Sequence, residues 1–166
     1  FNISTKYCLV YDNEGYGISF STTLGSYADH CTSVNNMWAG LQFKINIGHE
    51  ADIFINNSIL FGENGYEGIA SVNADDFVYA TYSNIEGGIG ESWFAVGCLD
   101  EDPLFRNKEL NDYRLLHGSP CIDTGDPGSP WDPNGTPPDM GAIPYEIAEF
   151  YIVPSVYRLP AAGGVL

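Results

Sequence analysis

Short runs of alternating apolar and polar residues recur along the first half of the chain. Two of them follow or include a glycine, at 17–20 and 40–43, and two more lie at 52–55 and 77–80. Alternation with a period of two predicts β-strands that bury one face. The intervening residues are rich in Asn, Gly and Asp, which favour turns. The pattern therefore predicts an all-β chain made of short strands.

These strands belong to a repeat. Four similar segments align on a small residue, and the four anchors are Cys8, Cys31, Ser58 and Ser83. Successive anchors lie 23, 27 and 25 residues apart, and a period in this range is typical of a solenoid. Three short strands in each unit predict a parallel β-helix. Leucine-rich repeats have a similar period, but they need an LxxLxL frame and a helical half that these units lack.

A coil of this kind makes a specific prediction about side chains. Alternate residues of each strand point inward and each unit stacks on the next, so like residues should stack on like. The four anchors form one expected inward stack, and the second is formed by Val10, Ser33, Leu60 and Ile85. The pairs Asn35-Asn36 and Asn56-Asn57 are expected at corners, since asparagine tolerates left-handed backbone.

The charge of the chain restricts its partners. Its 166 residues, enough for one domain, include 6 Lys and Arg against 22 Asp and Glu, which gives a net charge of −16. This balance argues against nucleic acid or an anionic membrane surface as a partner, because each requires a basic patch. No apolar run reaches about 18 residues, so no segment is expected to span a bilayer.

The four cysteines do not indicate a zinc site. Cys8, Cys31, Cys98 and Cys121 form no CxxC pair, and no histidine stands at zinc-finger spacing. We expect them to be small buried hydrophobic residues. A bridge between Cys98 and Cys121 is the alternative in an extracellular setting, and the sequence leaves it open.

Residues 102–145 differ from the repeat. Their aspartates lie in turns punctuated by Gly and Pro, and neither strand nor helix periodicity is sustained. We expect this stretch to close the repeat array at its C-terminal end. The predicted organisation is repeat units over 1–95, a loop-rich C-terminal cap over 96–146 and a tail of unknown role over 147–166. The chain opens partway into a unit, so further N-terminal units are expected.

Several motifs, mostly of the second half, occur together in one known family. They are NNSILFGENG, TYSNIEGG, DEDPLF, NDYRLLHGSPCIDTGDP and DPNGTPPDMGA. In these motifs the chain resembles the C-terminal part of secreted bacterial right-handed parallel β-helix repeat proteins, closely over 50–145 and as general repeats over 1–49. The resemblance implies a right-handed coil, secretion and display at the cell surface. Two departures are Asn134, where the family usually has a second Asp, and the tail 147–166, which matches no recognised sorting tail.

The acidic turns of this region indicate a calcium site. Calcium takes about six to eight oxygen ligands from carboxylates, amides and carbonyls. The candidate ligands are Asp126, Asp132, Asn134, Thr136 and Asp139. The run 132–136 alternates oxygen-bearing residues beside a turn glycine, but the bidentate Glu of an EF-hand is missing. The alternative is that these side chains cap turns by accepting backbone N–H bonds.

The sequence contains only weak candidates for catalytic residues, and its candidates for sugar binding are aromatic residues. A polysaccharide lyase needs a base and usually a calcium ion, yet Lys6 and Lys44 of the repeat region adjoin no acidic cluster. Hydrolysis needs carboxylates that converge on one face, whereas the pair Asp75-Asp76 would point to opposite faces of a strand. Exposed aromatic rings form platforms for sugars. Trp38 and Trp93 are the predicted ligand-binding residues, with packing in the core or at its rim as the alternative.

Together these observations predict a non-catalytic, extracellular β-helix module that binds polysaccharide or a cell-surface glycan, or mediates adhesion. Two alternatives stay open. The chain is the C-terminal part of a polysaccharide lyase or glycoside hydrolase whose active face lies in earlier units, or it is a purely structural spacer. The fold does not choose between them, because one fold serves many functions.

Overall fold

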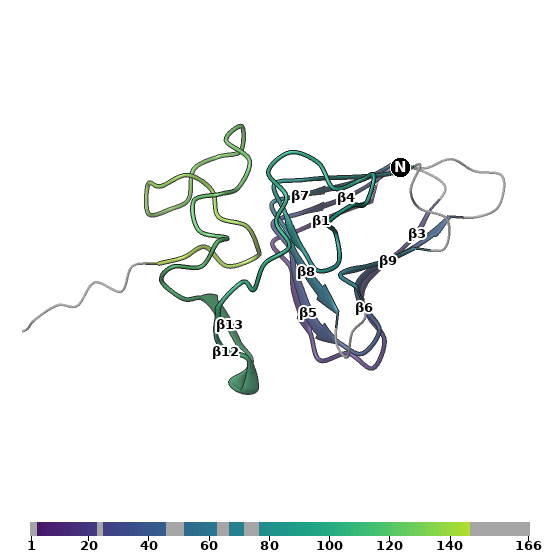
Figure 1. The fold of residues 1–166 in the computed structure, drawn as a ribbon, viewed down its shortest axis with the longest axis horizontal. Helices are drawn as coiled ribbons and strands as arrows, with labels where there is room; N and C mark the ends of the chain where they lie inside the picture. Colours follow the sequence, from purple (N-terminus) through teal and green to yellow (C-terminus); the bar gives the residue numbers. More distant parts are fainter. Residues whose placement is uncertain (1–2, 23–24, 46–51, 63–66, 72–76, 147–166) are drawn as a thin grey trace, which may run out of the picture.

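The computed structural model describes residues 3–22, 25–45, 52–62, 67–71 and 77–146. Strands β1 to β11 form three sheets of parallel strands (Figure 1). The first sheet contains β1 (Ile3–Lys6), β4 (Ser26–Asp29), β7 (Ile53–Asn56) and β10 (Val78–Thr81). The second sheet contains β2 (Leu9–Tyr11), β5 (Thr32–Asn36), β8 (Ile59–Gly62) and β11 (Asn84–Ile85). The third sheet contains β3 (Tyr16–Thr22), β6 (Ala39–Ile45) and β9 (Ile69–Ser71).

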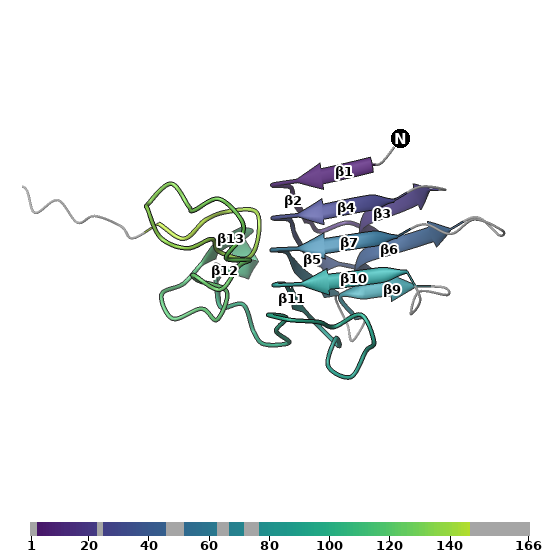
Figure 2. The ribbon, with the colours of Figure 1, turned by 90° about the horizontal axis from the view of Figure 1, so that it is seen from above.

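The chain visits the sheets in the order first, second, third, and each pass is one rung. Neighbouring rungs pair strand to strand, with β1 on β4, β4 on β7 and β7 on β10 in the first sheet. Figure 2 shows the rungs stacked in sequence order from β1 to β10. The prediction of an all-β fold with stacked parallel sheets is confirmed, and this arrangement is compatible with a β-helix.

The register of the second sheet confirms the expected inward stack. Val10 pairs with Ser33, Ser33 with Leu60, and Leu60 with Ile85. Leu60 and Ile85 are fully buried in the core between the sheets. Ser33 is tolerated in this core because its hydroxyl donates a hydrogen bond of 2.7 Å to the Gly40 carbonyl.

The anchor residues stack as well, one corner away. The backbone N–H of Cys31 donates to Ser58 Oγ at 3.1 Å, and that of Ser58 donates to Ser83 Oγ at 3.0 Å. The residue before each anchor has a left-handed backbone, with φ between 45° and 52° at Tyr7, His30, Asn57 and Tyr82. Of these four residues, Asn57 is the type that adopts this conformation most readily. Its corner position was predicted.

A row of glycines lets the third sheet approach the second. Gly17, Gly40 and Gly68 lie opposite one another on successive rungs. A Cβ atom added to Gly40 would lie 2.8 Å from the Gly68 carbonyl oxygen, and one added to Gly68 would lie 2.3 Å from the Leu60 carbonyl oxygen. No other residue type fits these positions without a shift of backbone.

Residues 86–99, the closing turn, add an irregular layer beyond the last rung. Parallel bridges join Ala80 to Phe94 and Asn84 to Leu99, so this turn continues the first and second sheets. Trp93 is 8% exposed and packs in the core between the sheets. The closing turn therefore covers the core at the end of the stack that follows β10 and β11.

Residues 100–146, the lateral segment, lie beside the stack (Figures 1 and 2). They contain β12 (Phe105–Asn107) and β13 (Asp112–Leu115), an antiparallel pair joined by the short 3-10 helix η1 (Lys108–Leu110). Within the described residues, no helix is long and apolar enough to cross a membrane.

The lateral segment packs on the outer face of the second sheet. A second core cluster places Cys121 and Met140 of the segment against Val34 of β5 and Ile59 of β8. We expected this stretch to close the end of the array, and its core contacts instead lie along the side, across several rungs. The physical reason is that the outer face of the second sheet carries apolar side chains, among them Leu9, Val34, Ile59 and Phe61, whose burial is favourable. The predicted boundary at residue 95 stays a prediction, and the tail 147–166 lies outside the described residues.

Candidate functional site

The first sheet presents an open row of aromatic side chains. Strands β4, β7 and β10 alternate, with Ala28, Ile55 and Ala80 buried in the core and the neighbouring residues facing out. The outward residues one position earlier are Tyr27, Phe54 and Tyr79, which the parallel register places side by side. Tyr27 is 38% exposed and Tyr79 is 48% exposed.

The three rings form one continuous stack. The centroids of Tyr27 and Phe54 are 4.9 Å apart with 14° between the ring planes, and those of Phe54 and Tyr79 are 5.2 Å apart with 19°. Such stacking covers the ring faces inside the row and leaves ring edges facing outward. Ser4 of β1 lies opposite Tyr27 in the register. Since serine is small, the outer face of the Tyr27 ring stays uncovered on that side.

A polar row runs parallel to the aromatic stack. It lies two positions further along each strand and consists of Lys6, Asp29, Asn56 and Thr81. Lys6 Nζ donates to Asp29 Oδ2 at 2.8 Å, and Thr81 Oγ1 donates to Asn56 Oδ1 at 3.0 Å. The polar row therefore contains two bonded pairs, Lys6 with Asp29 and Thr81 with Asn56.

The two rows line a groove of about 630 Å³ that runs across the rungs. The lateral segment contributes Asp126 to the lining. The backbone N–H of Asp126 donates to Asn57 Oδ1 at 2.6 Å, and Asn57 Nδ2 donates to Ser129 Oγ at 2.9 Å. Asn57, at its left-handed corner, thus fixes the turn 126–129 beside the polar row. We call this site the aromatic groove.

Asp29 is the charged residue of the aromatic groove with the most hydrogen-bond and ion-pair partners. Its Oδ1 lies 2.9 Å from His30 Nδ1 and accepts a bond of 3.3 Å from Asn57 Nδ2. Partial burial disfavours its ionisation, but the hydrogen bond and charge of Lys6 and the nearby His30 together hold the pKa of Asp29 below its ordinary value. Asp29 is therefore an ionised, immobilised carboxylate near neutral pH.

The two predicted ligand-binding tryptophans lie elsewhere. Trp93 is a core residue of the closing turn, so it offers no exposed platform. The residues around it do not alternate as in a strand, so the sequence did not show whether its side chain points inward or outward. Trp38 is 44% exposed and packs edge-on against Tyr16, with ring centroids 5.1 Å apart. It does not belong to the lining of the aromatic groove, and its role in binding stays a prediction.

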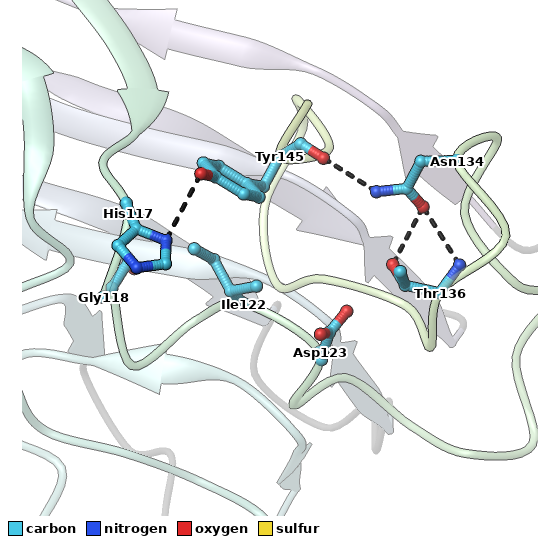
Figure 3. A pocket seen from close by; sticks show the side chains of 8 residues that line it. His117, Gly118, Ile122, Asp123, Asn134, Thr136 and Tyr145 are labelled. Carbon is cyan, nitrogen blue, oxygen red and sulfur yellow. Dashed lines mark hydrogen bonds between the residues drawn. The ribbon is translucent and has the colours of Figure 1, made fainter. Parts of the chain in front are cut away.

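The predicted calcium ligands divide between two places. Asp126 lies beside the aromatic groove, where its Oδ1 accepts from the Gly128 N–H at 2.8 Å. Asn134 and Thr136 line a second pocket, of about 440 Å³, together with Asp123 and Tyr145 (Figure 3). Asn134 Oδ1 accepts from both the N–H and the hydroxyl of Thr136, and its Nδ2 donates to the Tyr145 carbonyl.

Asp132 and Asp139 also accept backbone hydrogen bonds. Asp132 Oδ2 accepts from the Asp139 N–H at 2.9 Å, and Asp139 accepts from the N–H groups of Asp123 and Tyr145. Asp139 is 2% exposed, and this burial raises its pKa to about 6, with the nearby Asp132 and Asp123 charges acting in the same direction. Among the described residues, no group of three His, Cys, Asp or Glu side chains is placed to hold a metal ion. Calcium binding stays a prediction.

The described cysteines are all free thiols. Cys121 belongs to the cluster under the lateral segment, and Cys98 packs against the core between the sheets. Burial raises the pKa of the Cys121 thiol to about 11 and also raises the pKa of Cys31 and of Cys98. These three thiols are therefore packed and weakly ionised. Cys31 and Cys121 are buried, as expected, whereas Cys8 and Cys98 are partly buried.

Comparison of the chain with models of protein families, with curated proteins and with solved structures found no match. The aromatic groove is therefore argued from its geometry. Its residues had a signal in the sequence, because Tyr27, Phe54 and Tyr79 each stand four positions before an anchor. The signal for this row is an aromatic residue at the same distance before the anchor in three successive units. The presence of tryptophan is not the signal.

Proposed function

We propose that the chain is a right-handed parallel β-helix module of a secreted bacterial protein, displayed outside the cell, and that it binds a linear glycan in the aromatic groove. The observation that carries this proposal is the stack of Tyr27, Phe54 and Tyr79 beside a polar row in an open groove. Glycan sites combine these two features, since a sugar ring has apolar C–H faces and a rim of hydroxyl groups.

The repeat supports a linear ligand. The rungs of β4, β7 and β10 each supply one residue to the aromatic row and one to the polar row, at the separation of neighbouring strands, about 4.8 Å. A pyranose unit in an extended chain advances by a similar length. One sugar unit per rung would therefore meet the same kind of surroundings at every step.

Binding without cleavage fits the charges of the groove. Glycoside hydrolysis needs a carboxylic acid that keeps its proton near neutral pH and a second carboxylate that is ionised. The carboxylates that line the aromatic groove in the described part of the chain are Asp29 and Asp126. Because Lys6 holds the pKa of Asp29 low, Asp29 is suited to the second role and not to the first.

The test is a titration of linear hexasaccharides against the protein, followed by calorimetry and by amide chemical shifts. We expect the double variant Tyr27→Ala, Tyr79→Ala to bind about tenfold more weakly, because two ring contacts are lost. Trp38→Ala is the matched control, since it removes an exposed aromatic side chain outside the aromatic groove, and it should bind normally.

Three results would contradict this proposal. Binding that Trp38→Ala abolishes and the double variant preserves would move the site to the predicted tryptophan. Absence of binding by every hexasaccharide would favour a structural spacer. Release of shortened or unsaturated products during the titration would favour a hydrolase or a lyase.

A further inference from the structure

The aromatic groove has an unbalanced negative charge. Its lining includes three side chains of the charged types, Lys6, Asp29 and Asp126. Lys6 is ion-paired with Asp29 at 2.8 Å, so these two charges offset one another. Among the described residues, no Lys, Arg or His lies within ion-pair distance of Asp126. The charge left over on the wall of the groove is the Asp126 carboxylate.

The carboxylate of Asp126 is held in position, but only one of its two oxygens accepts a short hydrogen bond. Its Oδ1 accepts a hydrogen bond from the Gly128 N–H at 2.8 Å, while Oδ2 has only a long contact of 3.4 Å from Asn56 Nδ2. The bond from its own N–H to Asn57 and the bond from Asn57 to Ser129 hold the turn against the corner of the sheet. Oδ2 therefore remains available to a cationic donor on a ligand that lies along the polar row.

We propose that the aromatic groove selects a glycan with free primary amines, such as a chain of glucosamine units, over the acetylated neutral chain, and rejects uronate chains. This inference rests on the proposed function, because it assigns a ligand class to the same groove. An ammonium group can donate to Asp126 Oδ2 while the sugar rings contact the aromatic row. The net charge of −16 attracts such a polymer and repels a polyuronate over longer range.

The test compares three hexasaccharides, made of glucosamine, N-acetylglucosamine and galacturonate, at one pH and ionic strength. The first two have the same linkage and differ by the free amine. We expect glucosamine to bind at least about fivefold more tightly than N-acetylglucosamine, with weaker binding as salt rises, and galacturonate not to bind. An oligolysine with the same number of charges controls for nonspecific attraction and should not shift the groove amides.

Two variants that each remove one negative charge test whether the preference for glucosamine depends on Asp126 itself or on the overall charge. Asp126→Asn keeps an acceptor for the Gly128 N–H and removes the charge, so the ratio of glucosamine affinity to N-acetylglucosamine affinity should fall to about one. Asp102→Asn removes one charge from an exposed residue of the lateral segment and should keep the preference.

The outcomes separate this inference from the proposed function. Equal binding of the two glucosamine-based chains, loss of the preference in both variants, or equal shifts with oligolysine would overturn the amine selectivity and leave glycan binding in place. Tightest binding of galacturonate would overturn it as well. If none of the three chains binds, the proposed function itself fails for these ligands, and the selectivity fails with it.

Discussion

The outer faces of the two four-stranded sheets differ in what covers them. On the second sheet, Leu9, Val34 and Ile59 lie under the lateral segment and form a second core. On the first sheet, Tyr27, Phe54 and Tyr79 line an open groove. Both sheets have parallel strands stacked rung on rung and the same alternation of inward and outward residues. Residue type contributes to this difference, since aliphatic side chains such as Leu9, Val34 and Ile59 are stabilised by cover, while an aromatic row with hydroxyls beside polar side chains can face solvent.

The largest expected effect compares a truncation on each face. Ile59→Ala should lower the free energy of unfolding by about 2–5 kcal/mol, because it leaves a cavity between β8 and the lateral segment. Phe54→Ala removes a larger side chain from the open face, and we expect a loss of about 1 kcal/mol from the lost ring contacts. Urea unfolding of both variants measures the difference. Equal losses would mean that the two faces are equally important to stability.

A second, smaller effect is the dependence of stability on pH, through Asp139 under the lateral segment. Its folded pKa, about 6, lies above the ordinary value of 3.8, so the folded state binds this proton more tightly than the unfolded state does. Its contribution to stability is complete below about pH 4 and is lost as pH rises through 6, amounting to at most about 3 kcal/mol.

The measurement is urea unfolding at intervals between pH 4 and 7, on the native chain and on Asp139→Asn. The variant should lack most of the fall in stability across this range, although its amide cannot reproduce both hydrogen bonds and its stability at pH 4 should be lower. Asp29 acts in the opposite direction and at lower pH, because its pKa is lowered and its contribution disappears as pH falls. A fall of the same size in both proteins would exclude Asp139 as its source.

The smallest expected effect concerns calcium and the lateral segment. Asp132, Asn134 and Asp139 already accept hydrogen bonds within their turns. If they act only as turn caps, the alternative to the predicted calcium site, the unfolding midpoint will be the same in calcium and in EDTA at equal ionic strength. A ligand that binds only the folded state would raise it by mass action. A rise in calcium that Asp132→Ala abolishes would instead establish a metal site, and packing would then be only part of what holds the segment.

Much of the stacked fold could be predicted from the sequence, because each rung repeats the same pattern of strands, turns and inward residues. The stack from Val10 to Ile85 follows from the spacing of the anchors, and the register confirms it. The position of the lateral segment could not be predicted in this way. Cys121 and Met140 meet Ile59 from distant parts of an aperiodic stretch, and no spacing in the sequence encodes that contact.

The candidate site was missed for a different reason. Composition directed attention to tryptophan, the largest aromatic residue, whereas the groove is built from two tyrosines and a phenylalanine. Their common offset from the anchors predicts one row, and the inward Ala28, Ile55 and Ala80 predict its outward direction. The contribution of Asp126 lay beyond such reasoning, because it depends on where the lateral segment packs.

The aromatic groove also has an evolutionary property that follows from its construction. The rungs of β4, β7 and β10 each add one residue to the aromatic row and one to the polar row, and each rung contacts only its neighbours within the sheets. Duplication or deletion of a whole rung would lengthen or shorten the groove while its cross-section stayed constant. If the groove binds a glycan as proposed, the number of sugar units recognised would change with the number of rungs, while the kind of sugar would change by substitution at single positions such as 126.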